Sequence, residues 1–116
     1  GRIAVTGLSQ GGHGAFEFAA MRPEVFSAAA PVCGYGDPDR YAQRLDGVPV
    51  WAFHGEADDV VPVEATRAIV AALRGAGRRV RATWYPGVGH DSWTPAYRNE
   101  ELAAWLLGQR RAGAGR

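Results

Sequence analysis

The stretch Gly7-Leu8-Ser9-Gln10-Gly11 decides how this sequence is organised, because of the residues on either side of it. Residues 2–6 are apolar after the first position, which predicts a short buried strand. Residues 12–21 have the composition of a helix packed on a sheet. A serine between two glycines at a strand-to-helix turn is the sequence context of a nucleophile elbow, in which the serine backbone is strained and the glycines permit close backbone approach.

In such a turn the Ser9 side chain stands at the C-terminal edge of the sheet. The backbone N–H of Gln10 then lies at a helix N-terminus, aimed at the position where an oxyanion forms. The five-residue pattern is common by chance, however. It also fits a glycine-rich turn that binds a phosphate, with Ser9 as a donor, or that merely caps a helix.

The rest of the chain alternates strand-like and helical runs. The expected strands are residues 2–6, 26–33, 48–53 and 80–85, the last of them partly exposed. The expected helices are residues 12–21, 39–45, 63–73 and a final helix capped by Asn99 that runs to residue 107, with a long loop over 86–97. This alternation predicts an α/β fold with about four parallel strands and flanking helices, in which chemistry gathers beyond the C-terminal ends of the strands.

Reactive side chains follow three of the expected strands. Ser9 follows the first strand, the acidic loop 54–62 follows the third, and the loop 86–93, which contains His90, follows the fourth. A serine, an acid and a histidine therefore occur in the chain order of α/β-hydrolases, each in the kind of loop where catalysis is expected.

Through these motifs the chain resembles the α/β-hydrolase superfamily, and within it esterase-like members related to dienelactone hydrolases, phospholipase/carboxylesterases and predicted prolyl-oligopeptidase-type peptidases. The resemblance rests on Gly-Leu-Ser-Gln-Gly-Gly at 7–12, His-Gly-Glu-Ala-Asp-Asp-Val-Val-Pro at 54–62 and Tyr-Pro-Gly-Val-Gly-His-Asp-Ser-Trp at 85–93. It implies a partial α/β-hydrolase fold and a serine hydrolase of the carboxylesterase kind. A peptidase or a thioesterase of the same superfamily is the alternative, because fold resemblance does not choose among them.

The resemblance also assigns roles. Ser9 is expected to attack the carbonyl of a small-molecule ester, and His90 to take its proton and return it to the leaving alcohol. The family pattern H-G-x-x-D-x-x-V-P places the triad acid at Asp58, with Asp59 as the alternative. Gln10 supplies one oxyanion N–H. No cofactor or metal is implied, because a triad needs neither.

In this family pattern a second oxyanion donor comes from a loop after an earlier strand, whereas this sequence opens on the strand that leads to Ser9. Residues 1–108 are therefore expected to be the C-terminal part of a hydrolase domain, and residues 109–116 a frayed tail. The expected partners are a missing N-terminal half or a second copy, paired through the exposed first strand. An inactive hydrolase fragment and a phosphate-binding module are the alternatives from other functional classes.

Other polar and aromatic residues carry weaker expectations. Trp93 and Tyr35 are candidates to line a substrate pocket, Trp93 more strongly because it shares a loop with His90. Trp51 is a third aromatic candidate, although aromatic residues in this number serve the core first. His13, in the first turn of a helix, is expected to be a packing or surface residue.

Three further residues are expected to have structural roles. His54 ends a strand and is expected to organise the acidic loop, with no histidine spacing that indicates a zinc site. Cys33 is expected to be a small buried hydrophobic residue. Glu56 is expected to be a solvated loop charge.

Composition excludes several classes of function. The chain has 116 residues, 47% of them hydrophobic, which is enough for one core. Its 13 basic residues, all arginine, and 12 acidic residues are scattered and give a net charge of +1, so neither nucleic acid nor an acidic membrane is an expected partner. No stretch predicts a membrane span, a single cysteine precludes an internal disulfide, and nothing indicates where the protein resides.

Overall fold

The computed structural model describes residues 3–109, so the expectation of a frayed tail lies outside the described residues except for Gln109. The strands are β1 (Ile3–Leu8), β2 (Phe26–Val32), β3 (Val50–Gly55) and β4 (Val80–Tyr85). The helices are α1 (Gln10–Met21), α2 (Pro38–Arg44), α3 (Val63–Gly75), α4 (Trp93–Arg98) and α5 (Glu100–Gly108).

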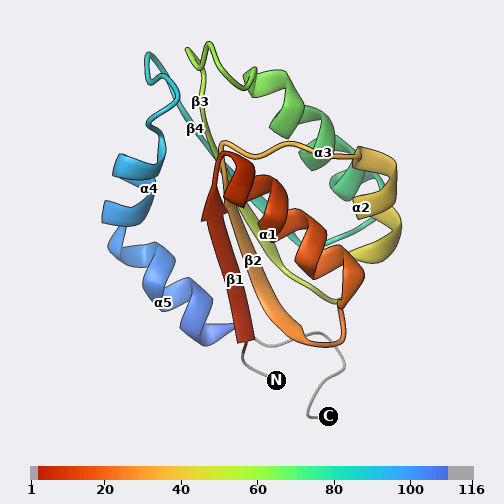
Figure 1. Cartoon of the computed structure of the whole chain (residues 1–116). Coiled ribbons are helices and arrows are strands. Elements are labelled where there is room, and N and C mark those ends of the chain that lie inside the picture. The colour runs from red at the N-terminus through yellow and green to blue at the C-terminus, as the bar shows by residue number, and fades with distance from the viewer. Residues whose placement is uncertain (1–2, 110–116) are drawn as a thin grey trace.

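The strands form one sheet in the order β1-β2-β3-β4, and every pair is parallel. Figure 1 shows α1, α2 and α3 on one face of the sheet and α4 and α5 on the other. The predicted α/β class and the four parallel strands are confirmed. Because parallel neighbours run in the same direction, the segments that follow β1, β3 and β4 leave the sheet at the same edge.

Two hydrophobic clusters lie on the two faces of the sheet. Successive residues of β3 alternate between them, with Val50 and Ala52 packed under α1–α3 and Trp51 and Phe53 packed toward α4 and α5. Both faces of β3 are therefore buried, which is why its sequence is continuously apolar rather than alternating.

The predicted loop over residues 86–97 is wrong in its second half, because α4 begins at Trp93. Pro95 lies in the first turn of this helix, where its missing N–H is not needed for helical hydrogen bonding. The sequence interpretation treated that proline as a loop residue. The prediction for the next helix is confirmed, since the Asn99 side chain accepts a hydrogen bond from the Glu101 N–H at 2.9 Å.

The first strand is not buried as predicted. Its residues are exposed or half-buried, and Ile3 retains 56% of its accessible surface. The reason is its place at an edge of the sheet, where only β2 pairs with it among the described strands. β4 occupies the other edge, and it is partly exposed as predicted.

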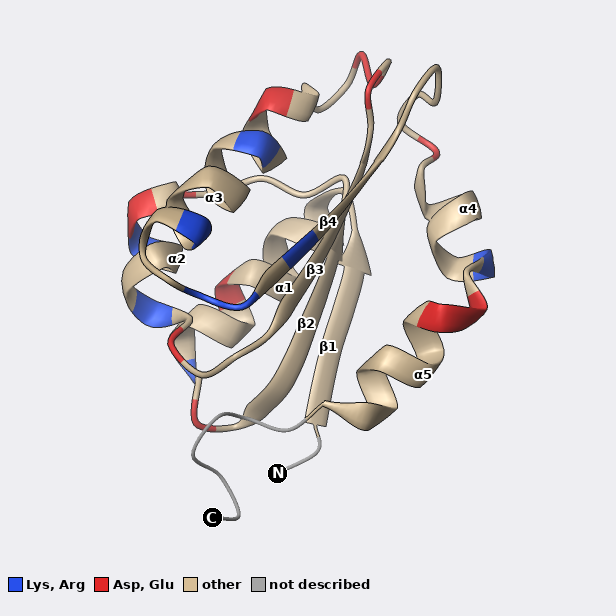
Figure 2. Cartoon of the chain, turned by 180° about the vertical axis from the view of Figure 1, so that it is seen from behind, with Lys and Arg blue, Asp and Glu red and all other residues tan. Residues whose placement is uncertain are grey.

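Charged residues are distributed over several elements. Figure 2 shows arginine and acidic positions interspersed along α2 and α3, with further charged positions on α5 and β4. Within residues 3–109, no helix combines the length and the apolar character that crossing a bilayer requires. The expectation that nucleic acid is not a partner stays a prediction.

Candidate active site

Ser9 occupies the turn between β1 and α1 and has an unusual backbone conformation. Its φ of 54° and ψ of −116° lie in a region that non-glycine residues rarely adopt. Such a conformation costs roughly 1–3 kcal/mol and persists only where surrounding contacts impose it. The Ser9 N–H donates a hydrogen bond to the carbonyl of Val32 at the end of β2, at 2.9 Å. The strained serine predicted for a nucleophile elbow is therefore present.

The glycines near Ser9 have different roles. A Cβ on Gly7 would lie 2.3 Å from the Gly11 carbonyl oxygen, and a Cβ on Gly12 would lie 2.6 Å from the Val32 carbonyl oxygen. A Cβ on Gly11 would meet nothing within 4 Å. The expectation that the bracketing glycines prevent side-chain clashes is therefore right for Gly7 and wrong for Gly11. Gly11 contributes the backbone that Gly7 approaches.

His90 links Ser9 to an acidic side chain. Its Nε2 lies 2.8 Å from the Ser9 hydroxyl, and its Nδ1 lies 2.8 Å from Oδ2 of Asp58. With a proton on Nδ1 donated to the carboxylate, a neutral imidazole offers Nε2 as the acceptor for the Ser9 hydroxyl. The loops after three separate strands therefore supply one continuous line of hydrogen bonds.

The Asp58 carboxylate is held in place by the turn it belongs to. Its Oδ1 accepts hydrogen bonds from the N–H groups of Val60 and Val61, both at 2.9 Å, which leaves Oδ2 facing His90. Burial raises the pKa of Asp58, but the hydrogen bonds from His90 and from these N–H groups together hold it below its usual value of 3.8. The carboxylate is therefore ionised at neutral pH. Asp59, the alternative acid, is exposed.

His54 organises the acidic loop, as predicted. Its side chain is fully buried, with Nδ1 2.7 Å from the Thr66 hydroxyl and Nε2 2.7 Å from the Val61 carbonyl oxygen. Its Nε2 also lies 3.3 Å from Oδ2 of Asp58. Thr66, on α3, was not singled out from the sequence, and its position among helical residues gave no signal of this contact.

The aromatic candidates separate into different environments. Trp93 is half-buried and presents its ring edge-on to His90, with 5.6 Å between ring centroids. Tyr35 stacks on His13 at 4.7 Å, and its carbonyl accepts a hydrogen bond from Nδ1 of His13. Trp51 is 1% exposed and belongs to the core. Trp93 alone among these aromatic rings contacts a residue of the Ser9–His90–Asp58 line.

Glu56 is not simply solvated, because it forms an ion pair with Arg67 of α3. The sequence interpretation missed this contact, since the partner is 11 residues away, across the start of a helix.

Gln10 is the first residue of α1. The first N–H groups of a helix have no intrahelical acceptors and point along the positive end of the helix dipole. The structure therefore places the Gln10 N–H at a helix N-terminus immediately after Ser9, as predicted.

The residues that could hold a metal overlap with this site. Among the described residues, ligand atoms of Cys33, Asp58 and His90 lie within 4.8 Å of one another. Asp58 and His90 already share a hydrogen bond through a potential ligand atom of each, and burial raises the pKa of the Cys33 thiol, which disfavours the thiolate that a metal requires. These donors suit a hydrogen-bonded triad better than a metal site.

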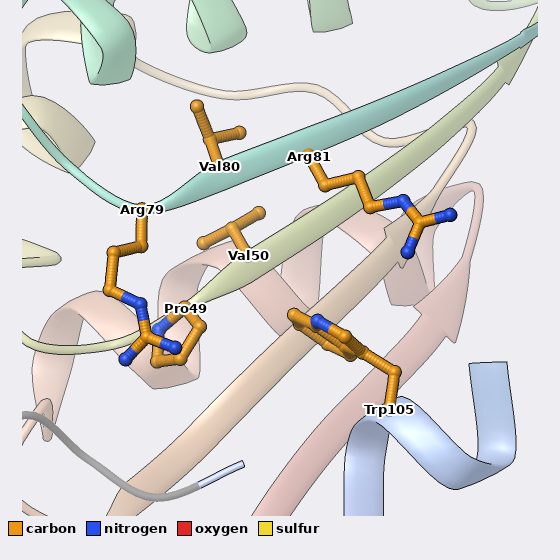
Figure 3. A pocket seen from close by; sticks show the side chains of 6 residues that line it. All are labelled: Pro49, Val50, Arg79, Val80, Arg81 and Trp105. Atoms are coloured by element: carbon orange, nitrogen blue, oxygen red, sulfur yellow. The ribbon is translucent and has the colours of Figure 1, made fainter. Parts of the chain in front are cut away.

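A separate hollow of about 240 Å³ lies at the opposite ends of β3 and β4 (Figure 3). Its lining includes Arg79, Arg81 and Trp105. Arg81 is already engaged, because it pairs with Glu101 at 2.6 Å and lies 3.8 Å over the ring of Trp51. Arg79 donates a hydrogen bond to the Gln109 side chain at 3.0 Å, so both arginines of this hollow, which is distinct from the Ser9 site, already have partners.

Comparison with known proteins places the chain among hydrolases. The family described as the dienelactone hydrolase family matches residues 1–104. The crystal structure of a thermostable esterase aligns with 95% of this chain and 31% of its own length, at 42% identity and a TM-score of 0.90. Esterase PE8 aligns with 90% of this chain and 50% of its own, at 26% identity and a TM-score of 0.74.

Two curated relatives match shorter stretches of this chain. Serine carboxypeptidase II-1 of Hordeum vulgare is 39% identical over 59 residues, which are 51% of this chain and 14% of the relative. Acyl-protein thioesterase 1 of Gibberella zeae is 43% identical over 44 residues, which are 38% of this chain and 19% of the relative. The chain thus spans less than a fifth of either curated relative.

Proposed function

This chain belongs to the dienelactone hydrolase family of hydrolases, and from that premise we propose that it cleaves carboxylic esters by serine-dependent acyl transfer. The observation that carries the proposal is the line of hydrogen bonds from Ser9 through His90 to Asp58, with both contacts at 2.8 Å. A nucleophile, a base and an acid that orients the base are the components that this chemistry needs.

Each residue has a defined part in the reaction. The Ser9 hydroxyl attacks the ester carbonyl while Nε2 of His90 takes its proton, and the same nitrogen then protonates the departing alkoxide. Water repeats these steps on the acyl-enzyme to release the acid and regenerate Ser9. Asp58 keeps the proton of His90 on Nδ1 and stabilises the imidazolium that forms.

The developing oxyanion needs donors that are in place before the reaction. The Gln10 N–H, at the start of α1, is the proposed first donor. Losing one donor of an oxyanion hole costs on the order of 10²–10³ in turnover, so a second donor matters for activity.

We propose that the second donor belongs to a further part of the hydrolase domain, which packs against the exposed edge of β1. Ile3 and Leu8 of β1 are exposed, as are Phe18 and Met21 of the adjoining α1. This chain aligns with 31% of the thermostable esterase at a TM-score of 0.90. These observations support residues 1–108 as the C-terminal part of a longer hydrolase domain that covers the β1 edge, in preference to self-association of two copies through that edge.

An ester is the preferred substrate class because the thermostable esterase is 42% identical over 95% of this chain. The peptidase and thioesterase alternatives share the same attacking group and base. Trp93 is the proposed substrate contact because its ring borders His90. Tyr35, which packs on His13, is a weaker one. Matched p-nitrophenyl ester, thioester and anilide substrates distinguish the classes, and the ester is expected to have the highest kcat/KM.

A fluorophosphonate probe tests the serine mechanism directly. We expect labelling of the wild-type chain at Ser9 and none in the Ser9→Ala or His90→Ala variants. Ser27→Ala is the matched control, because Ser27 is buried near the start of β2. A folded wild-type chain that does not label would contradict the proposal. Thermal stabilisation by inorganic phosphate would then favour the phosphate-binding alternative, and its absence an inactive fragment.

A further inference from the structure

The end of β2 contacts the loops that carry all three residues of the proposed triad. The Val32 carbonyl accepts the hydrogen bond from the Ser9 N–H at 2.9 Å. Two residues later, the Gly34 carbonyl accepts a hydrogen bond from the Thr66 hydroxyl at 3.2 Å, and that hydroxyl lies 2.7 Å from the His54 ring of the acidic loop. Residues 32–34 therefore connect the nucleophile turn with the acidic loop.

Cys33, between these two contacts, reaches the histidine loop. Its side chain is fully buried, and its thiol donates a weak hydrogen bond to the His90 carbonyl oxygen at 3.8 Å. Its N–H donates to the Phe53 carbonyl oxygen of β3 at 2.7 Å. The same residue thus ties the end of β2 to β3 and to the backbone of His90.

The backbone of Cys33 is strained. Its φ of 41° makes it, with Ser9, one of two described non-glycine residues in the left-handed region. A buried non-glycine residue with this φ costs roughly 1–3 kcal/mol, so the surrounding contacts must impose it. The two strained residues lie close together, because the Ser9 N–H is hydrogen-bonded to Val32, the residue before Cys33. Strain at both residues indicates a segment shaped for function as well as for packing.

A second buried polar group adjoins the thiol. The Ser92 hydroxyl, two residues after His90, is buried and has no hydrogen bond of ordinary geometry. Burial raises the pKa of Cys33, and the interactions of the thiol with the Ser9 backbone and the Ser92 hydroxyl lower it by less. The sulfur is thus a neutral thiol beside polar groups of both the nucleophile turn and the histidine loop.

We propose that Cys33 is a positioning residue, which fixes the His90 backbone through its thiol and thereby holds the imidazole at hydrogen-bonding distance from Ser9. The inference rests on the proposed serine mechanism and deepens it. Cys33 does not act as a nucleophile. Its effect passes through the His90 loop, while the carbonyls on either side of it hold the nucleophile turn and, through Thr66 and His54, the acidic loop.

The test compares three variants by two measurements. Cys33→Ala removes the donor, Cys33→Ser keeps a hydroxyl donor, and Val70→Ala is a control that removes buried volume in the core cluster under α1–α3. The measurements are kcat and KM on a p-nitrophenyl ester, and the NMR resonance of the His90 Nδ1–H proton that is shared with Asp58.

We expect Cys33→Ala to lower kcat about tenfold with little change in KM, because small displacements of a base cost rate rather than binding. Its Nδ1–H resonance should broaden or disappear through faster solvent exchange. Cys33→Ser should retain most of the wild-type kcat and of the Nδ1–H resonance. Val70→Ala should retain kcat and the resonance despite lower stability.

If Val70→Ala lost as much kcat and as much of the resonance as Cys33→Ala, the role of Cys33 would be packing alone. Unchanged kcat and resonance in Cys33→Ala would also overturn the inference. If Cys33→Ala fails to fold, kcat and the Nδ1–H resonance of Cys33→Ser decide the question. Retention of both supports the serine hydroxyl as a replacement donor, and loss of both opposes the inference. A wild-type chain without turnover would contradict the proposed function alone, because the resonance still reports whether Cys33 holds His90.

Discussion

The Ser9 hydroxyl lies 2.8 Å from Nε2 of His90, although the two residues are 81 positions apart in the sequence. Neither loop could produce this contact by itself. It exists because β1 and β4 belong to the same parallel sheet and release the chain at the same edge. The strained turn at Ser9 then directs its side chain toward the loop that follows β4.

Replacing Ser9 by glycine is expected to raise the free energy of unfolding by about 1 kcal/mol relative to Ser9→Ala, because glycine adopts a φ of 54° without steric cost. Urea unfolding of the two variants measures the difference. Ser27→Gly is the matched control. Because Ser27 lies within β2, Ser27→Gly should be less stable than Ser27→Ala. A Ser9→Gly variant no more stable than Ser9→Ala would show that the turn holds no strain.

The three glycines around the elbow should respond differently to alanine. Gly7→Ala and Gly12→Ala place a Cβ within 2.6 Å of backbone oxygen and should each cost about 2 kcal/mol or more. Gly11→Ala meets open space in α1 and should be neutral or stabilise by up to about 1 kcal/mol. Thermal unfolding of the three variants gives the comparison. A Gly11→Ala variant as unstable as Gly7→Ala would contradict this assignment of the close contact.

Acid should remove the contribution of Asp58 to stability. Its pKa is below 3.8 in the folded protein, so the folded state favours the carboxylate. That contribution is present above the unfolded pKa and is lost as the pH falls through the lower folded value. Asp58→Asn, whose amide oxygen can still accept from Val60 and Val61, should therefore be less stable than wild type at neutral pH. The gap should narrow below about pH 3.8, as urea titrations at several pH values can show. A gap independent of pH would oppose this linkage.

Thr66 is expected to stabilise the acidic loop through its hydroxyl. Thr66→Val keeps the side-chain shape but removes the contacts to His54 and to the Gly34 carbonyl, which should cost about 1–3 kcal/mol because both partners are left buried. Thr66→Ser retains the hydroxyl and should recover most of this loss. Unfolding free energies of both variants decide the point, and a loss in Thr66→Ser as large as that in Thr66→Val would show that the hydroxyl alone does not stabilise the loop.

Most of the fold could be predicted from the sequence because its signals are local. Apolar runs marked all four strands, and Asn99 marked the start of α5. The helix α4 was missed because Pro95 is a loop signal in sequence and a first-turn residue in the structure. For β1 the apolar run predicted burial, whereas the expected pairing along this strand implied an exposed edge. The strand is exposed, because an apolar run is buried only where neighbouring strands and helices cover it.

The sequence by itself determined that a serine, an aspartate and a histidine follow strands of one parallel sheet, because strand, turn and helix signals depend on neighbouring residues. Only the tertiary structure decided between Asp58 and Asp59 for contact with His90, since that choice depends on the turn in which Val60 and Val61 hold one carboxylate oxygen. It also placed Cys33 beside His90, 57 residues away. No local pattern encodes a contact that depends on a left-handed φ at one strand end and on the path of a loop from another strand.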